Sequence, residues 1–258
     1  MLQEKEFRIE NLSKPLADID INQSGSWVGI TEFSDDKQSI YFGDKQVRLP
    51  EKIRFPKIRS IDEETVLFAN ARAWTQDNAW IITSSGEVKA NFSAGDAIRD
   101  IVITKDFIVV THFDEAACFG EGINVYDYEG RHLFGYHEVF KDKAVKIFDC
   151  YAACLIKENQ IIFYPYNKFP LVLLNIEVRT QQIWETPNLL KGSNAVTKLD
   201  EKVYFHSPYK DQTGMYKWET GSEKAEKIGE HSSYFVRGLP NGKFLSRNDS
   251  GYSIISPQ

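Results

Sequence analysis

The sequence has 258 residues, of which 42% are hydrophobic and 13% aromatic, enough to build the core of one large β domain or of two small ones. Its formal net charge of −6 argues against a broad electrostatic contact with nucleic acid or with an anionic membrane. No apolar run approaches the roughly 18 residues of a membrane helix, and the opening MLQEKEFRIE lacks the features of a secretory signal. We therefore expect a cytoplasmic protein.

Short runs rich in β-branched and aromatic residues alternate with polar turns along the whole chain. In chain order, strands are predicted at 6–12; at 17–22, 26–33, 39–42 and 45–49; at 57–62, 65–71, 78–84 and 88–93; at 98–104, 107–113, 123–128 and 132–138; at 147–157, 160–166, 170–177 and 181–186; at 194–200, 202–208, 214–220 and 224–229; and in the C-terminal runs SYFVRGL, GKFLSRN and YSIISP.

Equivalent turns recur along the chain, at Gly43, Gly86, Gly130, near 178–180 and at Gly221. A repeat of about 40 to 50 residues with four strands, a to d, is typical of a β-propeller blade. The last unit has only three strands, and the strand at 6–12 is left over at the other end. We predict an all-β, six-bladed propeller in a single domain, residues 1–258, whose last blade is closed by the N-terminal strand. A β-sandwich or two small β domains remain as alternatives.

The two faces of such a propeller would differ in their loops. The a–b and c–d turns are short, whereas the b–c and d–a connections include the longer segments 71–78, 113–122, 166–170, 186–193 and 207–214. Long loops on a rigid scaffold often carry function, so we expect binding on this long-loop face, although they could be tolerated insertions. The candidate binding residues are Arg72, Trp74, Phe113, Asp114, Glu115, Phe119, Tyr164, Tyr166, Phe169 and Tyr209. Aromatic residues and arginine are enriched in protein interfaces, and the alternative for these aromatics is packing between blades.

The inner strands would line a central channel. Aligning them places polar side chains at a common depth, and the candidates for the channel mouth are Arg59, Arg99, Asp100, Asp149 and Arg237. These charges could bind a ligand, or they could pair with one another for a structural reason, because a buried charge needs a partner.

Two segments resemble a group of uncharacterised bacterial six-bladed propeller-like proteins. The matching positions are Phe113, Asp114 and Glu115; Asp149, Cys150, Tyr151 and Ala152; Tyr164 and Tyr166; and Phe169, Pro170 and Leu171. Ala116 stands where that group has glycine. The resemblance implies the propeller fold and two distinctive neighbouring blades, and it implies no activity.

The residues needed for catalysis or for a zinc site do not form a recognisable motif. Cys150 and Cys154 are four apart on a predicted strand, so their Cα atoms would lie about 13 Å apart, too far to share one zinc ion. With Cys118 they form an odd, sparse set that favours free thiols. The sequence contains neither the G-x-S-x-G motif nor a phosphate-binding glycine loop.

We therefore predict a non-enzymatic binding scaffold without a cofactor, whose long-loop face engages another protein. The alternative is a small-molecule hydrolase resembling the lactonases, or a ligand sensor, with Ca²⁺ or Mg²⁺ held at the channel mouth by Asp100, Asp114 and Asp149.

Overall fold

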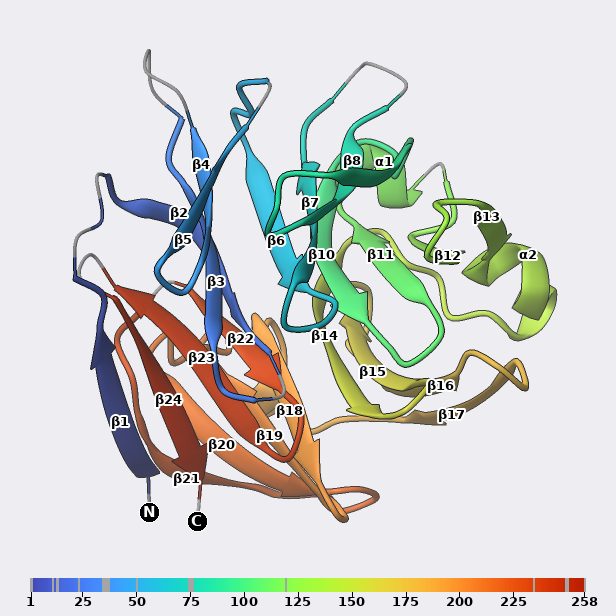
Figure 1. Cartoon of the computed structure of the whole chain (residues 1–258). Coiled ribbons are helices and arrows are strands. Elements are labelled where there is room, and N and C mark those ends of the chain that lie inside the picture. Colours follow the sequence, from blue (N-terminus) through green and yellow to red (C-terminus); the bar gives the residue numbers. More distant parts are fainter. Residues whose placement is uncertain are drawn as a thin grey trace.

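The computed structural model describes residues 2–10, 12, 14–22, 24–33, 38–49, 51–73, 77–118, 120–233, 235–248 and 251–257, apart from the side chains of Glu115 and Cys118. It is a six-bladed β-propeller in which each blade is a four-stranded antiparallel sheet (Figure 1). The predicted fold is thereby confirmed.

Five blades are formed by consecutive strands. Blade 1 contains β2 (Leu16–Ile21), β3 (Trp27–Thr31), β4 (Ser39–Phe42) and β5 (Lys45–Arg48). Blade 2 contains β6 (Pro56–Ser60), β7 (Thr65–Asn70), β8 (Ala79–Thr83) and β9 (Val88–Phe92). Blade 3 contains β10 (Ile98–Ile103), β11 (Ile108–His112), β12 (Ile123–Tyr126) and β13 (His132–Gly135). Blade 4 contains β14 (Cys150–Lys157), β15 (Gln160–Pro165), β16 (Leu171–Asn175) and β17 (Thr180–Trp184). Blade 5 contains β18 (Ala195–Leu199), β19 (Lys202–His206), β20 (Gly214–Glu219) and β21 (Ala225–Glu230).

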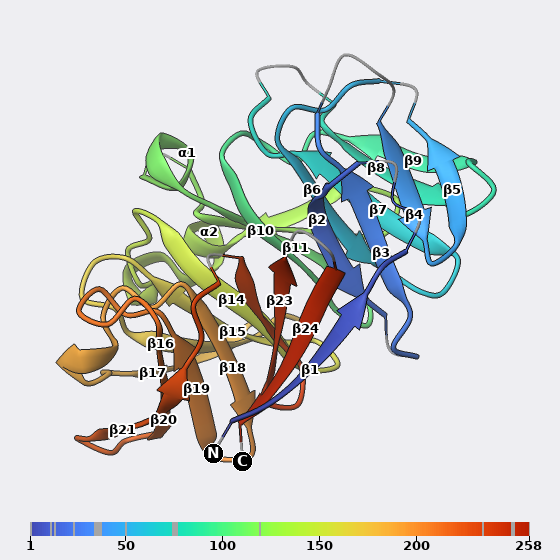
Figure 2. The ribbon, with the colours of Figure 1, turned by 90° about the vertical axis from the view of Figure 1, so that its left-hand side faces the viewer.

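Blade 6 joins the two ends of the chain. Its strands are β22 (Val236–Leu239), β23 (Lys243–Asn248), β24 (Gly251–Pro257) and β1 (Leu2–Arg8), and β1 pairs antiparallel with β24 along its whole length. Both termini therefore lie side by side, as Figures 1 and 2 show. The predicted closure is confirmed, but the strand lies four residues earlier in the chain than the predicted 6–12.

Hydrophobic side chains pack between blades, and the six clusters they form follow the ring from one blade to the next. The central strands contribute to two clusters at once. In β11, Ile108 and Val110 pack toward blade 2, whereas Val109 between them packs toward blade 4. Because both sides of these strands are buried, their sequences are continuous apolar runs.

Helical turns interrupt three connections: α1 (Asp114–Cys118), α2 (Tyr136–Phe140) with η1 (Lys141–Lys143), and η2 (Asn188–Leu190). The predicted strand at 132–138 was too long, since β13 ends at Gly135 and α2 follows. The helix places Tyr136 and Phe140 on one side, with ring centroids 5.0 Å apart, and buries Tyr136 completely between blades 3 and 4. Tyr and Val in this segment favour a strand as well as a buried helical turn, so the sequence alone suggested a strand.

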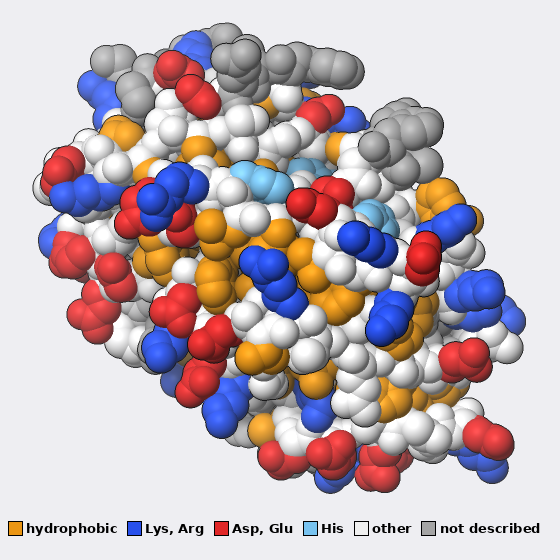
Figure 3. All heavy atoms as spheres, turned by 90° about the vertical axis from the view of Figure 1, so that its right-hand side faces the viewer, with side chains coloured by type: hydrophobic (Ala, Val, Ile, Leu, Met, Phe, Trp, Pro, Cys, Tyr) orange, Lys and Arg blue, Asp and Glu red, His pale blue; other side chains and the backbone are white. Residues whose placement is uncertain are grey.

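The outer edges of blades 3 and 4, seen in Figure 3, expose scattered hydrophobic side chains between charged groups of both signs. The exposed hydrophobic residues of these blades include Leu133, Phe148, Val178 and Ile183. Among helices of the described residues, none is long and apolar enough to cross a membrane.

Candidate functional site

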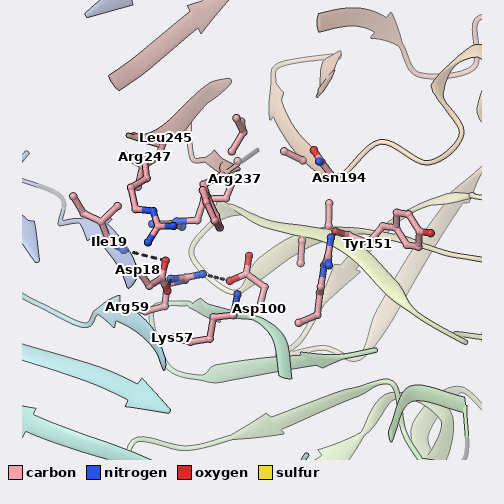
Figure 4. A pocket seen from close by; sticks show the side chains of 17 residues that line it. Asp18, Ile19, Lys57, Arg59, Asp100, Tyr151, Asn194, Arg237, Leu245 and Arg247 are labelled. Atoms are coloured by element: carbon pink, nitrogen blue, oxygen red, sulfur yellow. Dashed lines mark hydrogen bonds and ion pairs between the residues drawn. The ribbon is translucent and has the colours of Figure 1, made fainter. Parts of the chain in front are cut away.

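The channel opens on the long-loop face into a cavity of about 250 Å³, which we call the channel mouth. It is lined by Asp18, Ile19, Lys57, Arg59, Arg99, Asp100, Tyr151, Ala152, Ala153, Asn194, Ala195, Phe235, Val236, Arg237, Gly238, Leu245 and Arg247. Figure 4 shows charged side chains from several blades pointing into it. Four of the five predicted mouth residues, namely Arg59, Arg99, Asp100 and Arg237, are brought together here.

Arg59 is the buried centre of this cavity's charge network. Its guanidinium forms an ion pair with Asp18 at 2.7 Å and another with Asp100 (Figure 4). Its Nε donates to the carbonyl of Ile101 at 3.0 Å. Burial alone would raise the pKa of Asp18, but the positive charges of Arg59 and Lys57 outweigh burial and hold that pKa below its usual value. Asp18 thus remains ionised, and a single arginine pairs with both carboxylates.

Three other cations of the mouth are less well compensated. Lys57 makes no hydrogen bond or ion pair within the described chain, and its burial lowers its pKa. Arg99 donates to the carbonyl of Tyr151 at 3.3 Å and lies over the Tyr151 ring, but it forms no ion pair with a described residue. Arg237 pairs with Asp20, yet its Nε is buried without a partner among described groups, and burial lowers its pKa to about 10.

Below the Arg59 network the channel widens into a second cavity of about 620 Å³, on the side of the short turns. Its charged lining residues are Asp20, Asp62, Glu63, Asp100, Glu158, Arg59, Lys105 and Arg237. Carboxylates outnumber cations there, whereas cations outnumber carboxylates at the mouth. The channel is therefore positive toward the long-loop face and negative toward the opposite one.

Beside the mouth, a groove of about 630 Å³ combines phenylalanine with arginine, and we call it the Phe–Arg groove. Its aromatic and basic lining residues are Phe33, Phe55, Phe113, Phe235, Arg54, Lys57, Arg72, Arg99 and Arg247. Three arginines lie over phenylalanine rings: Arg54 over Phe55, Arg72 over Phe113 and Arg247 over Phe235, with centroid distances of 5.4, 4.4 and 3.8 Å. Arg72 is also paired with Asp114 at 2.7 Å, so three predicted face residues meet here.

Blades 4 and 5 carry an aromatic group, the tyrosine cluster, formed by Tyr151, Tyr166, Phe169 and Tyr209. The Tyr151 ring lies 6.2, 5.2 and 5.9 Å from the rings of the other three, and its hydroxyl is hydrogen bonded to that of Tyr209. Phe169 is buried at the centre, whereas Tyr166 and Tyr209 are 46% and 53% exposed. Because Tyr151 also lines the channel mouth, the cluster is continuous with it.

Some predicted residues lie elsewhere. Tyr164 is fully buried between blades 4 and 5, where its hydroxyl bonds to Thr186 at 2.9 Å, so it contributes to packing and not to the face. Asp149 lines neither channel cavity; burial raises its pKa, and its Oδ1 is buried without a hydrogen bond to a described group. Trp74, Phe119 and the side chain of Glu115 lie outside the described residues.

The three carboxylates considered as ligands for a divalent cation do not form one site. Asp100 pairs with Arg59, Asp114 pairs with Arg72, and Asp149 stands apart from the mouth lining. In the described part of the chain, no three His, Cys, Asp or Glu side chains are grouped so that they could hold a metal ion. Cys150 and Cys154 are buried thiols on β14, and burial raises the pKa of each to about 12.

Sequence reasoning missed several residues of the mouth and groove: Asp18, Lys57, Tyr151, Phe33, Phe55, Phe235 and Arg247. Three of the inner strands contain a β-bulge at their second residue, which is Ala17 in β2, Arg99 in β10 and Tyr151 in β14. The sequence alignment assumed regular strands and placed Asp149 at the mouth, whereas Tyr151, at the bulge of β14, lines it.

No protein-family model and no curated protein matches this chain, so the resemblance to uncharacterised bacterial propeller-like proteins stays a prediction. Solved structures with a similar fold include virginiamycin B lyase from Staphylococcus aureus, with 12% identity, a TM-score of 0.55 and full coverage of both chains. The WD40 repeats of RRP9 match with 6% identity and a TM-score of 0.58, over 100% of this chain and 97% of that one. YCF48 bound to a peptide matches with 6% identity, a TM-score of 0.55 and the same coverage. These similarities show the fold alone.

Proposed function

We propose that this protein is a binding scaffold whose long-loop face holds a segment of another protein. The observation that carries the proposal is the continuity of the tyrosine cluster, the channel mouth and the Phe–Arg groove across one face. Tyr151 joins the cluster to the mouth, and Lys57, Arg99, Phe235 and Arg247 line both the mouth and the groove.

The residue types on this face support a protein partner. Interfaces are enriched in Tyr, Phe and Arg, and their central residues are aromatic anchors that lose little conformational entropy on binding. Tyr209 and Phe235 expose 53% and 60% of their surfaces, although large aromatic rings gain free energy when they are buried. Among solved structures of similar fold, YCF48 is bound to a peptide, which supports the proposal of a protein segment as the partner.

Affinity capture from the cells that make the protein tests this function. The test variant is Tyr166→Ser with Tyr209→Ser, which removes the two exposed rings of the cluster. The control variant is Val178→Ser with Leu199→Ser, which removes exposed hydrophobic side chains, 62% and 41% exposed, at short turns away from this face. We expect a partner that the wild type and the control retain and the test variant loses. A partner retained equally by all three proteins would place binding elsewhere.

A further inference from the structure

The channel mouth carries an excess of positive charge, although the protein as a whole has a net charge of −6. Its two lining carboxylates, Asp18 and Asp100, are both engaged by Arg59. Lys57, Arg99 and Arg247 line the same cavity, and no described carboxylate forms an ion pair with Lys57 or Arg99. Cations confined together in a partly buried cavity repel one another, and an anion bound between them would relieve that repulsion.

The donors of the mouth match an oxyanion. Arginine presents a planar set of N–H groups that suits phosphate and carboxylate oxygens, and lysine adds a compact charge. The buried Nε of Arg237 has no described acceptor, although an unpaired buried donor costs free energy. A cavity of about 250 Å³ is somewhat smaller than most sites for drug-sized ligands, so it suits a compact anionic group.

We propose that the channel mouth binds a compact dianionic group, a phosphate or a dicarboxylate, between Lys57, Arg99 and Arg237. The group would enter from the long-loop face, which is the positive end of the channel. Tyr151 and Phe235 at the rim would contact whatever the group is attached to. This site does not depend on the proposed protein partner, because a small anion would bind even when no protein occupies the long-loop face.

Isothermal titration calorimetry of the whole chain tests the site, with inorganic phosphate and malonate as probes at low and at high salt. We expect at least one probe to bind at low salt, with an affinity that falls as salt rises. If only phosphate binds, the natural ligand carries a phosphate, and if only malonate binds, it carries a dicarboxylate. If both bind, the site recognises compact dianions of either kind. If neither probe binds the wild type, the proposal is overturned.

Variants locate the binding. Lys57→Gln and Arg99→Gln should each weaken it about tenfold or more, since each removes a charged donor. Arg131→Gln is the control, because Arg131 lies in the β12–β13 turn and, among the described residues, pairs with the nearby Asp127 and Glu129. Circular dichroism confirms that each variant is folded, and Lys57→Arg, which keeps the charge, should retain binding. Binding that is unchanged in Arg99→Gln and Lys57→Gln would also overturn the proposal.

Discussion

Arg59 shows how a single residue can determine the architecture of the channel. Its side chain is 4% exposed and connects Asp18 of blade 1 with Asp100 of blade 3. Desolvation of an ion pair is costly, so such a network adds little stability compared with a hydrophobic core of similar volume. Its effect is to fix the inner strands of blades 1 to 3 relative to one another, which positions the other cations of the mouth.

Replacing Arg59 tests this role. Arg59→Met leaves Asp18 and Asp100 half-buried without their main counter-charge, and we expect the free energy of unfolding to fall by about 3–5 kcal/mol. Urea denaturation at neutral pH measures the change. Arg131→Gln, which removes two exposed ion pairs, should alter stability far less, because solvent screens exposed charges. A loss no larger than that of the control would show that the network is unimportant for stability.

The same network predicts how stability depends on pH. The folded-state pKa of Asp18 lies below its ordinary value of 3.8, so its ionised form stabilises the fold above that pH. This contribution is lost as pH falls below 3.8 through the folded-state pKa. Wild type should therefore lose stability in that range more steeply than Asp18→Asn, as measured by urea denaturation at a series of pH values. Parallel curves for the two proteins would contradict the assignment.

At the level of residues, sequence reasoning found the channel charges that follow the alternation of the inner strands. It identified Asp100 and Arg237 because aligning the inner strands places them at a common depth, and Arg59 because it lies beside that position. It could not predict that Arg59 is the centre of the network. The pairing of Arg59 with two carboxylates on different blades depends on distances between segments about 40 residues apart in the sequence. Tyr164 was misplaced because β15 ends at Pro165, so only Tyr166 leaves the sheet.

Among the elements, the inner strands are the least regular and the most important for the site. Bulges at Ala17, Arg99 and Tyr151 turn the second residue of three of these strands toward the long-loop face. The strands themselves were predicted to within a few residues, because β-branched runs and turn residues mark them locally. Bulges and the short helices α1 and α2 depend on how neighbouring blades pack, and no local sequence pattern predicts them.

Close packing of the inner strands predicts a sensitive glycine in β22. A Cβ added at Gly238 would lie 1.9 Å from the carbonyl oxygen of Val196 in β18 and 3.1 Å from the sulfur of Cys154 in β14. Gly238→Ala should therefore lower the free energy of unfolding by about 3 kcal/mol, measured by denaturation. Gly221→Ala is the control: no atom of the described residues lies within 4 Å of the added Cβ, and the left-handed backbone, with φ of +86°, costs about 1 kcal/mol. Equal effects would contradict the close approach.

For the whole molecule, the pairing of β1 with β24 closes the ring. Phe7 stacks on Tyr252 with ring centroids 4.8 Å apart, and Phe7, Ile9 and Leu12 pack against the cluster between blades 6 and 1. The sequence predicted this closure from a count of strands, since three at one end and one at the other complete six blades. Counting strands is sufficient because unpaired strand edges are unfavourable, even where the bounds of the N-terminal strand are imprecise.

Removing residues 1–8 tests the closure. The truncated chain should unfold at a lower temperature and associate through the exposed edge of β24, which calorimetry and light scattering would detect. Phe7→Ala is the milder change, with an expected loss of about 1–3 kcal/mol in the full-length chain, and Glu6→Ala, at an exposed position on the same strand, is its control. An unchanged melting temperature after truncation would mean that the ring does not depend on β1.

The central claim is that the long-loop face is the one that binds. Photo-crosslinking in the cells that make the protein tests it most directly, with a photoreactive phenylalanine analogue in place of Tyr209 in one variant and of Val178 in another. Both positions are more than half exposed, and only Tyr209 belongs to the tyrosine cluster. We predict a discrete crosslinked partner from position 209 and none from position 178. A partner captured from position 178 and not from position 209 would contradict the account.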